Sequence, residues 1–220
     1  QEIVQAARHN LNQGTWDYLS GGSESETTLR RNRLAFDRLA FRPRILVDVS
    51  TIDTSTTLLG HKMRIPVMLA PIGSQQVFTS EGGVAATKAA VEFGILDVVS
   101  SVTEPSLEDI ASAASNPKVF QLYLNGDWAW TKDMISRIKR AGYLALCITV
   151  DTARPSRRDR TMIARWSPRA NFLASRSPTR YQVSGGRNGA HASSVTWETI
   201  DRIKDLAGLP FMLKGVGTAE

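Results

Sequence analysis

The sequence has little of what disulfide, metal or thiol redox sites are usually made of. It contains one cysteine, Cys147, which lies inside an apolar run and has no second cysteine to pair with. Nothing therefore requires an oxidising compartment, and we interpret Cys147 as a small core residue. No spacing of cysteine and histidine is typical of a metal site, so we expect no bound metal.

Long apolar runs and nucleotide-binding fingerprints are absent as well. No run approaches the roughly 20 apolar residues that a membrane span needs. The first residues, Gln1-Glu2-Ile3-Val4, are neither an initiator methionine nor a signal peptide, and the chain looks trimmed at both ends. Neither a P-loop nor a G-x-G-x-x-G motif is present, which disfavours those modes of nucleotide binding. We expect a cytoplasmic protein, with a peripheral membrane or peroxisomal location left open.

Negative charge is scarce in one segment. The net charge is +6 over 220 residues, yet residues 151–190 alone carry nine arginines against two aspartates, a net +7. This segment is interpreted either as an anion-binding or membrane-surface loop or as a solvated loop without a ligand. No nucleic-acid partner is expected.

From Pro66 onward, short apolar runs alternate with amphipathic ones. The apolar runs predict strands at 66–72, 95–100, 118–124, 144–151 and 210–216. The amphipathic runs predict helices at 83–93, 107–112, 130–141 and 197–206, with Ser106 and Thr196 as N-caps of two of them. The first four strands start 23 to 29 residues apart, which is typical of βα units with a parallel sheet.

The first 65 residues follow a different pattern. Residues 3–19 predict a helix that is broken near Gly14, residues 27–36 a second helix, and residues 51–63 a hairpin around Gly60. We interpret residues 1–65 as an extension packed on a barrel formed by residues 66–220, with a long arginine-rich loop at 151–195.

The fold class that these patterns predict is α/β, a TIM (β/α)8 barrel represented by about its first five strands. Five strands do not close such a barrel, which needs eight and is typically about 250 residues long. An arc of five strands would leave open sheet edges. We therefore expect the remaining strands to be missing or supplied by another chain.

Polar side chains or glycine turns follow the apolar part of each predicted strand, and we expect them to line the barrel mouth. They come in chain order and suit the rim of a polar heteroaromatic cofactor: Ala70-Pro71-Ile72-Gly73, Ser100, Gln121 with Tyr123, Thr149 with Asp151, and Lys214.

Seven segments, taken together, carry a resemblance to a known family. They are Tyr18-Leu19-Ser20-Gly21-Gly22, Phe41-Arg42-Pro43-Arg44-Ile45-Leu46, Asp53-Thr54-Ser55-Thr56-Thr57-Leu58-Leu59-Gly60, Ala70-Pro71-Ile72-Gly73, Phe120-Gln121-Leu122-Tyr123, Thr149-Val150-Asp151-Thr152 with Arg157-Arg158, and Leu213-Lys214-Gly215-Val216. The chain resembles the N-terminal part of the FMN-dependent α-hydroxy acid dehydrogenases and oxidases, which include glycolate oxidase, lactate oxidase and mandelate dehydrogenase.

The resemblance implies FMN as cofactor and a role for each matching residue. The backbone of Ala70, Pro71, Ile72 and Gly73 would lie against the flavin ring. Ser100, Gln121 and Thr149 would hydrogen-bond the polar edge of the ring, and the charge of Lys214 would stabilise the reduced flavin.

The same resemblance implies the substrate residues. Arg158 would bind the substrate carboxylate through its planar fork, and Tyr18 and Tyr123 would hydrogen-bond substrate oxygens. Asp151 would orient the family's catalytic histidine. Tyr123, Asp151 and Arg158 are thus the catalytic candidates.

The sequence also departs from the family pattern. Its three histidines, His9, His61 and His191, lie outside any Asn-His-Gly-Gly-Arg segment, which carries the family's catalytic base. Val102 replaces a large aromatic residue of several members, which predicts a wider substrate pocket.

The resemblance implies oxidation of a small (S)-2-hydroxy acid to a 2-oxo acid by the parent enzyme. The electron acceptor is left open among oxygen, a quinone and a cytochrome, and a homo-oligomer is left open as well. The alternatives are a catalytically inert partial barrel and a basic anion-binding module.

Overall fold

The computed structural model describes residues 1–153, 156–167 and 194–219. It contains two compact units, one of residues 1–53 with the described residues 156–167, the other of residues 54–153 with 194–219. The predicted division at residues 65 and 66 stays a prediction, and most of the predicted arginine-rich loop, with Arg154, Arg169, Arg176, Arg180, Arg187 and His191, lies outside the described residues.

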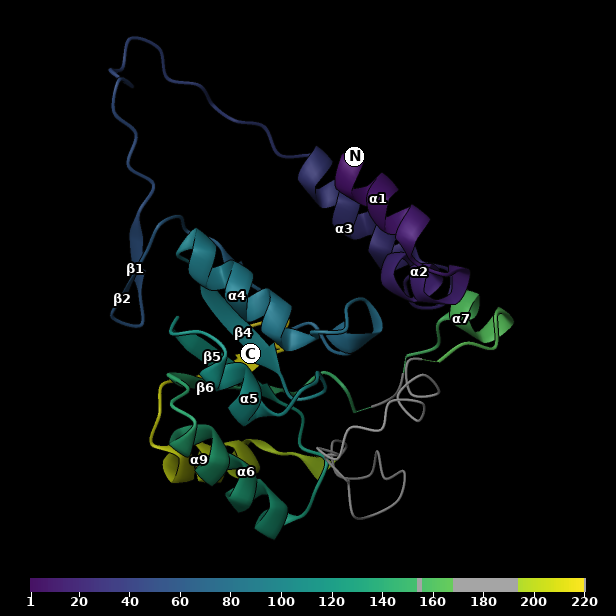
Figure 1. The fold of residues 1–220 in the computed structure, drawn as a ribbon, viewed down its shortest axis with the longest axis vertical. Coiled ribbons are helices and arrows are strands. Elements are labelled where there is room, and N and C mark those ends of the chain that lie inside the picture. The colour runs from purple at the N-terminus through teal and green to yellow at the C-terminus, as the bar shows by residue number, and fades with distance from the viewer. Residues whose placement is uncertain (154–155, 168–193, 220) are drawn as a thin grey trace. The chain divides into compact units, whose positions relative to one another are not determined.

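A five-stranded parallel sheet is the centre of the second unit, with the strand order β3-β4-β5-β6-β7. Strands β4, β5 and β6 of this sheet are labelled in Figure 1. The strands are β3 Met68–Leu69, β4 Leu96–Ser100, β5 Lys118–Leu122, β6 Ala145–Thr149 and β7 Phe211–Lys214. Each neighbouring pair is parallel, which confirms the predicted pairing in chain order. Strand β3 is shorter than the predicted 66–72, since Pro66 and Pro71, which lack an N–H donor, lie on either side of its paired residues.

Four helices accompany these strands: α4 Gly83–Phe93, α5 Leu107–Ser112, α6 Trp128–Arg140 and α9 Trp197–Ala207. Side-chain caps fix three of their starts. Ser106 accepts from Asp109 N, Asp127 accepts from Trp130 N, and Thr196 forms a capping box with Thr199. The cap at Asp127 starts α6 two residues earlier than the sequence predicted.

Alternation along the strands divides the core into two clusters. The larger cluster joins one sheet face to α5, α6 and α9 and includes Phe120, Leu146 and Ile148. The smaller cluster lies on the other face and includes Val98, Val119 and Cys147, so Cys147 is a core residue as predicted. This second face is the one that the polar residues at the strand ends share.

Two buried residues of opposite charge lie at the amino-terminal ends of β4 and β5. Asp97 of β4 and Lys118 of β5 are register partners, and both are buried. Thr87 Oγ1 donates to Asp97 Oδ2 at 2.8 Å, and Lys118 Nζ donates to the carbonyls of residues 111, 114 and 116. Burial raises the pKa of Asp97 and lowers the pKa of Lys118, and each charge only partly offsets the burial of the other.

The hairpin predicted around Gly60 is present. Strands β1 Thr56–Leu58 and β2 His61–Met63 pair antiparallel. The two residues between them, Leu59 and Gly60, have φ of 51° and 78°. Two successive residues with positive φ are what a tight two-residue hairpin turn requires. A 3-10 turn, η1 Gln75–Val77, precedes α4.

Helices make up the first unit: α1 Glu2–Asn10, α2 Gln13–Ser20, α3 Thr27–Asp37 and α7 Asp159–Ile163. The predicted break near Gly14 lies at Leu11 and Asn12, where Asn12 caps α2 by accepting from Thr15 N at 2.9 Å. Helix α7 was not predicted. Its five residues are too few for a periodic apolar pattern, and they lie among arginines.

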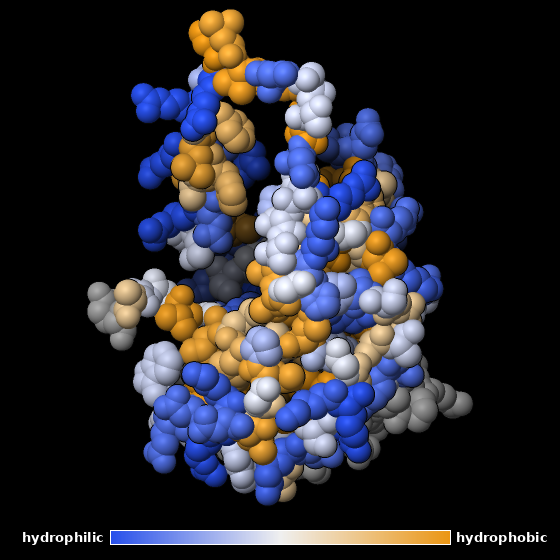
Figure 2. Space-filling model, turned by 90° about the vertical axis from the view of Figure 1, so that its left-hand side faces the viewer, coloured by the Kyte–Doolittle hydropathy of each residue, from blue (hydrophilic) through white to orange (hydrophobic). Residues whose placement is uncertain are grey.

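The segment from α3 to β1 is extended and carries exposed apolar side chains. Leu39, Phe41, Ile45 and Leu46 are between 76% and 101% exposed. Figure 2 shows apolar surface along this segment, which is at the top of both views. None of the helices that the structure describes is both long enough and apolar enough for a membrane crossing.

Candidate active site

Four polar side chains lie at the carboxyl ends of neighbouring strands, on one face of the sheet. Ser100, Gln121, Thr149 and Lys214 each come two residues after an apolar residue of the smaller cluster: Val98, Val119, Cys147 and Met212. Side chains two apart in a strand share a face. We call Ser100, Gln121, Thr149 and Lys214 the strand-end row.

Hydrogen bonds connect three members of the strand-end row. Ser100 Oγ donates to Gln121 Oε1 at 2.9 Å, and Gln121 Nε2 donates to Thr149 Oγ1 at 2.8 Å. All three residues are at most 5% exposed. Among the described residues, the second N–H of the Gln121 amide and the hydroxyl proton of Thr149 have no acceptor. The row therefore holds donors in fixed positions that a ligand with acceptor atoms can use.

Lys214 completes the row and brings in Asp151. Thr149 and Lys214 are register partners, and Lys214 Nζ lies 4.0 Å from Asp151 Oδ1. Both side chains are close to half exposed, so this ion pair leaves the ammonium accessible. Gly215 has φ of +110°, and a Cβ there would lie 2.5 Å from Asp151 Cβ. Glycine at 215 is therefore what lets Asp151 approach β7.

The loop after β3 lies beside this row. A Cβ built on Gly73 would lie 3.8 Å from Ser100 Oγ and only 2.6 Å from Val102 Cγ2. Ser74 N donates to Val102 O at 2.9 Å, and Gln75 N donates to Thr103 Oγ1. The loops that follow β3 and β4 are thus joined by hydrogen bonds, and the Ala70–Gly73 backbone is held against Ser100. Val102 is 38% exposed at this rim.

Tyr123 follows the end of β5. Its backbone N–H donates to Ser101 Oγ at 3.1 Å, which ties it to the loop after β4. The Tyr123 side chain is half-buried. Tyr123 is therefore held by its backbone at the same ends of the strands as the row.

The first unit brings Tyr18 and Arg158 together. Arg158 Nη1 donates to Tyr18 O at 2.7 Å and lies 3.4 Å from Gly21 O. The Arg158 guanidinium lies 4.9 Å from the centroid of the Tyr18 ring. The other edge of the guanidinium, Nε with Nη2, has no hydrogen-bond partner among the described residues, so it is available for a carboxylate.

The described histidines lie outside these groups. His9 is on α1, where its Nδ1 lies 2.8 Å from Gln5 O, and His61 is on β2. No cluster of three or more histidine, cysteine, aspartate or glutamate side chains within the described residues could hold a metal ion.

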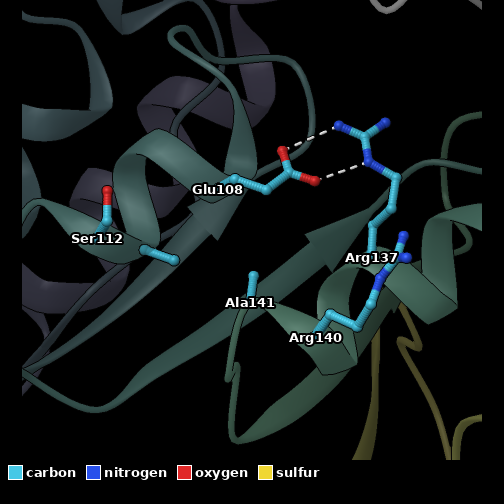
Figure 3. A pocket seen from close by; sticks show the side chains of 6 residues that line it. Glu108, Ser112, Arg137, Arg140 and Ala141 are labelled. Carbon is cyan, nitrogen blue, oxygen red and sulfur yellow. Dashed lines mark hydrogen bonds and ion pairs between the residues drawn. The ribbon is translucent and has the colours of Figure 1, made fainter.

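A hollow of about 430 Å³ lies between α5 and α6, away from the predicted residues. Figure 3 shows Glu108 and Arg137 pointing toward each other across its edge, with bonds of 2.7 and 2.9 Å. The Arg137 guanidinium lowers the pKa of Glu108 by binding both of its oxygens. The fork occupies both partners, so the contact joins α5 to α6.

Residues 7–220 match the model of the FMN-dependent dehydrogenase family. The chain belongs to this family. Its curated relatives include glycolate oxidase 5 of Oryza sativa subsp. japonica, 34% identical over 229 residues, and glycolate oxidase of Spinacia oleracea, 35% identical over 233 residues. Each comparison covers the whole of this chain and 62% of the relative, so the chain spans 62% of the length of these relatives.

Solved structures of FMN-dependent dehydrogenase relatives share the fold. A lactate oxidase from Pediococcus acidilactici has a TM-score of 0.86 at 28% identity and covers 99% of this chain and 59% of its own. A mandelate oxidase has a TM-score of 0.81 at 29% identity over 98% of this chain and 60% of its own. The predicted barrel fold, here as five parallel strands, and the predicted family are therefore confirmed, and FMN is the cofactor of that family.

The strand-end row fits the polar edge of a flavin. That edge presents two carbonyl oxygens and the ring nitrogens N1 and N5, which accept hydrogen bonds, and an N3–H group, which donates one. The row offers the free amide proton of Gln121, the hydroxyl of Thr149 and the ammonium of Lys214 from adjacent strands. Glycine at 73 lets the Val102 side chain pack against this backbone beside Ser100, because a Cβ there would lie 2.6 Å from Val102 Cγ2.

Proposed function

We propose that the protein binds FMN through the strand-end row and takes part in the oxidation of a small (S)-2-hydroxy acid to the 2-oxo acid. The observation that carries this proposal is the buried, hydrogen-bonded set Ser100–Gln121–Thr149 beside Lys214, in a chain of the FMN-dependent dehydrogenase family. When bound, FMN supplies the two-electron acceptor that no side chain of this protein provides.

The side chains near the flavin would bind and orient it. Gln121 and Thr149 would donate to its acceptor atoms, and Ser100 would keep the Gln121 amide in one orientation through its 2.9 Å bond. Lys214 would place a positive charge where negative charge develops during oxidation. The Ala70–Gly73 backbone would lie against the ring, with Val102 at the side where the substrate's side chain extends.

The substrate residues would act on the two ends of the hydroxy acid. Arg158 would bind the carboxylate through its free Nε and Nη2 edge, while Nη1 stays bound to Tyr18 O. Tyr18 and Tyr123 would donate hydrogen bonds to substrate oxygens. Asp151, near Lys214, would orient a base that takes the hydroxyl proton.

None of the described residues is placed to act as this base. His9 bonds within its own helix, and His61 lies on the β1–β2 hairpin. General bases contribute about 10²–10⁴-fold to rate. We therefore expect residues 1–220 alone to bind FMN and hydroxy acid but not to turn over glycolate, lactate or mandelate.

Flavin binding and turnover are measured separately. The chain is purified, FMN is added, and bound flavin is measured by absorbance after gel filtration. Turnover is assayed with a dye, with oxygen and with cytochrome c as acceptors. Failure to retain FMN would overturn the proposal and favour an inert partial barrel or an anion-binding module. Turnover of about 1–10³ s⁻¹ would show that a base is present after all.

A further inference from the structure

Helix α7 connects two side chains that both lie on Tyr18. Arg158 is the N-cap residue of α7, and its guanidinium lies 4.9 Å from the Tyr18 ring. Trp166 comes just after the helix, and its ring centroid lies 5.2 Å from that of Tyr18, with the planes 38° apart. One five-residue helix thus presents a cation and an indole to the same tyrosine.

The end of α7 determines where Trp166 goes. Arg165 N donates to Met162 O at 3.1 Å, and Trp166 N donates to Thr161 O at 2.9 Å. This is the Schellman arrangement, in which the residue after the C-cap takes the left-handed conformation. Arg165, with φ of 49°, has that conformation although it is not glycine. The chain is therefore turned back, so that Trp166 faces α2.

The Trp166 indole packs against α2 at Gly14. A Cβ built on Gly14 would lie 2.3 Å from Trp166 Cδ1 and 2.5 Å from Trp166 Cγ. Real Cβ atoms do not approach ring atoms so closely, so any larger residue at 14 would displace Trp166. Glycine is otherwise unfavourable inside a helix, and the contact with Trp166 gives it a reason to be there.

We propose that Trp166 is a positioning residue, which fixes the Tyr18 ring and with it the Arg158 guanidinium for binding the substrate carboxylate. This inference rests on the proposed function, since it takes Tyr18 and Arg158 as substrate residues. Trp166 acts through Tyr18 rather than by touching the substrate. Aromatic contacts of this kind are worth enough to change ligand affinity about three- to tenfold.

The test uses the 220-residue chain loaded with FMN and measures glycolate affinity by ligand-observed NMR. Trp166→Leu and Gly14→Ala should each weaken glycolate binding about three- to tenfold. Gly14→Ala removes no group from the cluster and raises helix propensity, so its loss of affinity has to come from displacing the indole. Trp166→Phe, which keeps an aromatic ring, should retain most of the affinity.

Arg165 provides a matched pair of variants outside the cluster. Arg165→Gly keeps the left-handed conformation and should leave glycolate affinity unchanged, whereas Arg165→Val disfavours that conformation and should weaken it. FMN affinity and the unfolding midpoint are measured for every variant. A general structural defect would lower FMN affinity together with glycolate affinity, whereas positioning lowers glycolate affinity and leaves FMN affinity unchanged.

Arg158→Ala separates this inference from the proposed function. If it leaves glycolate affinity unchanged, the substrate role of Arg158 is wrong and so is the proposed function at that end. If Arg158→Ala abolishes binding while Trp166→Leu and Gly14→Ala bind like the unmodified protein, only the positioning role of Trp166 is refuted.

Discussion

Replacing Gln121 by leucine removes the centre of the strand-end row at nearly constant volume. The amide makes two hydrogen bonds, to Ser100 Oγ at 2.9 Å and to Thr149 Oγ1 at 2.8 Å. All three residues are buried, so both hydroxyls are left without these partners in the variant. Each lost bond costs about 1 kcal/mol, and each stranded hydroxyl adds to that. We expect Gln121→Leu to lower the free energy of unfolding by about 2–4 kcal/mol.

Urea unfolding followed by far-UV circular dichroism measures this change. With a slope of about 2 kcal/mol per molar urea, the midpoint should fall by about 1–2 M. The triple variant Ser100→Ala, Gln121→Leu, Thr149→Val is the control. It removes both partners of these two side-chain bonds, and replacing both partners by apolar groups of similar shape is nearly neutral for stability. Among the described residues, only the Val102 N–H, which donates to Ser100 Oγ at 3.3 Å, loses its acceptor. We expect its midpoint to recover most of the loss.

FMN affinity separates the two roles of the Gln121 amide, which are to stabilise the fold and to donate to the flavin. Both Gln121→Leu and the triple variant lack the donor that we assign to the flavin edge, so both should bind FMN more weakly, whatever their stability. If Gln121→Leu lowers the free energy of unfolding by less than about 0.5 kcal/mol, the reasoning on buried hydrogen bonds is refuted. Undiminished FMN affinity in the triple variant would refute the assignment of the row.

Three further predictions concern charged residues. Lys214→Met should weaken FMN binding about tenfold or more, because it loses one charged hydrogen bond. Fluorescence titration measures the affinity, and Lys62→Met on the β1–β2 hairpin is the control. Arg158→Lys should weaken glycolate binding about tenfold because an ammonium has no bidentate fork, and unchanged NMR affinity would contradict this. Because the pKa of Asp97 is raised, its contribution to stability is fully present below the unfolded carboxyl value of about 3.9 and is lost as pH rises through the folded value. Asp97→Asn keeps an acceptor for Thr87 and should therefore reduce this fall in the free energy of unfolding, measured by urea titration at a series of pH values. If the variant and the unmodified protein lose stability equally with rising pH, Asp97 is not the source of the fall.

The strands and most helices were predictable because their signals are local. Buried strands such as Ala145–Thr149 read as uninterrupted apolar runs, and Ser106 and Thr196 mark helix starts by their own side chains. The short α7 was not predictable, since a five-residue helix among arginines has no periodic pattern. Its existence depends on contacts with α2, which is about 140 residues earlier in the chain.

In the candidate site, too, the residues with a local sequence pattern were predictable and those that depend on distant contacts were not. The alternation of Val98, Val119, Cys147 and Met212 with the row could have placed the row on one sheet face from the sequence alone. Trp166 could not be found in this way, because only the fold reveals that Gly14 faces its indole. The pair of Asp97 and Lys118 was also missed, since a charged residue at the start of a strand is usually exposed.

The bond from Arg158 to Tyr18 spans 140 positions of the chain and has a consequence for biosynthesis. Helices α1 to α3 leave the ribosome before the sheet does, and the residues that hold Tyr18 follow only after the whole of β1 to β6 has been made. At about 5–20 residues per second this takes roughly 7–28 s. Throughout that time Tyr18 and Gly14 of α2 lack their contacts with Arg158 and Trp166. Chaperones that hold unfolded segments can bind the nascent chain in this interval, and a pause in translation before the codon for Trp166 would prolong that exposure.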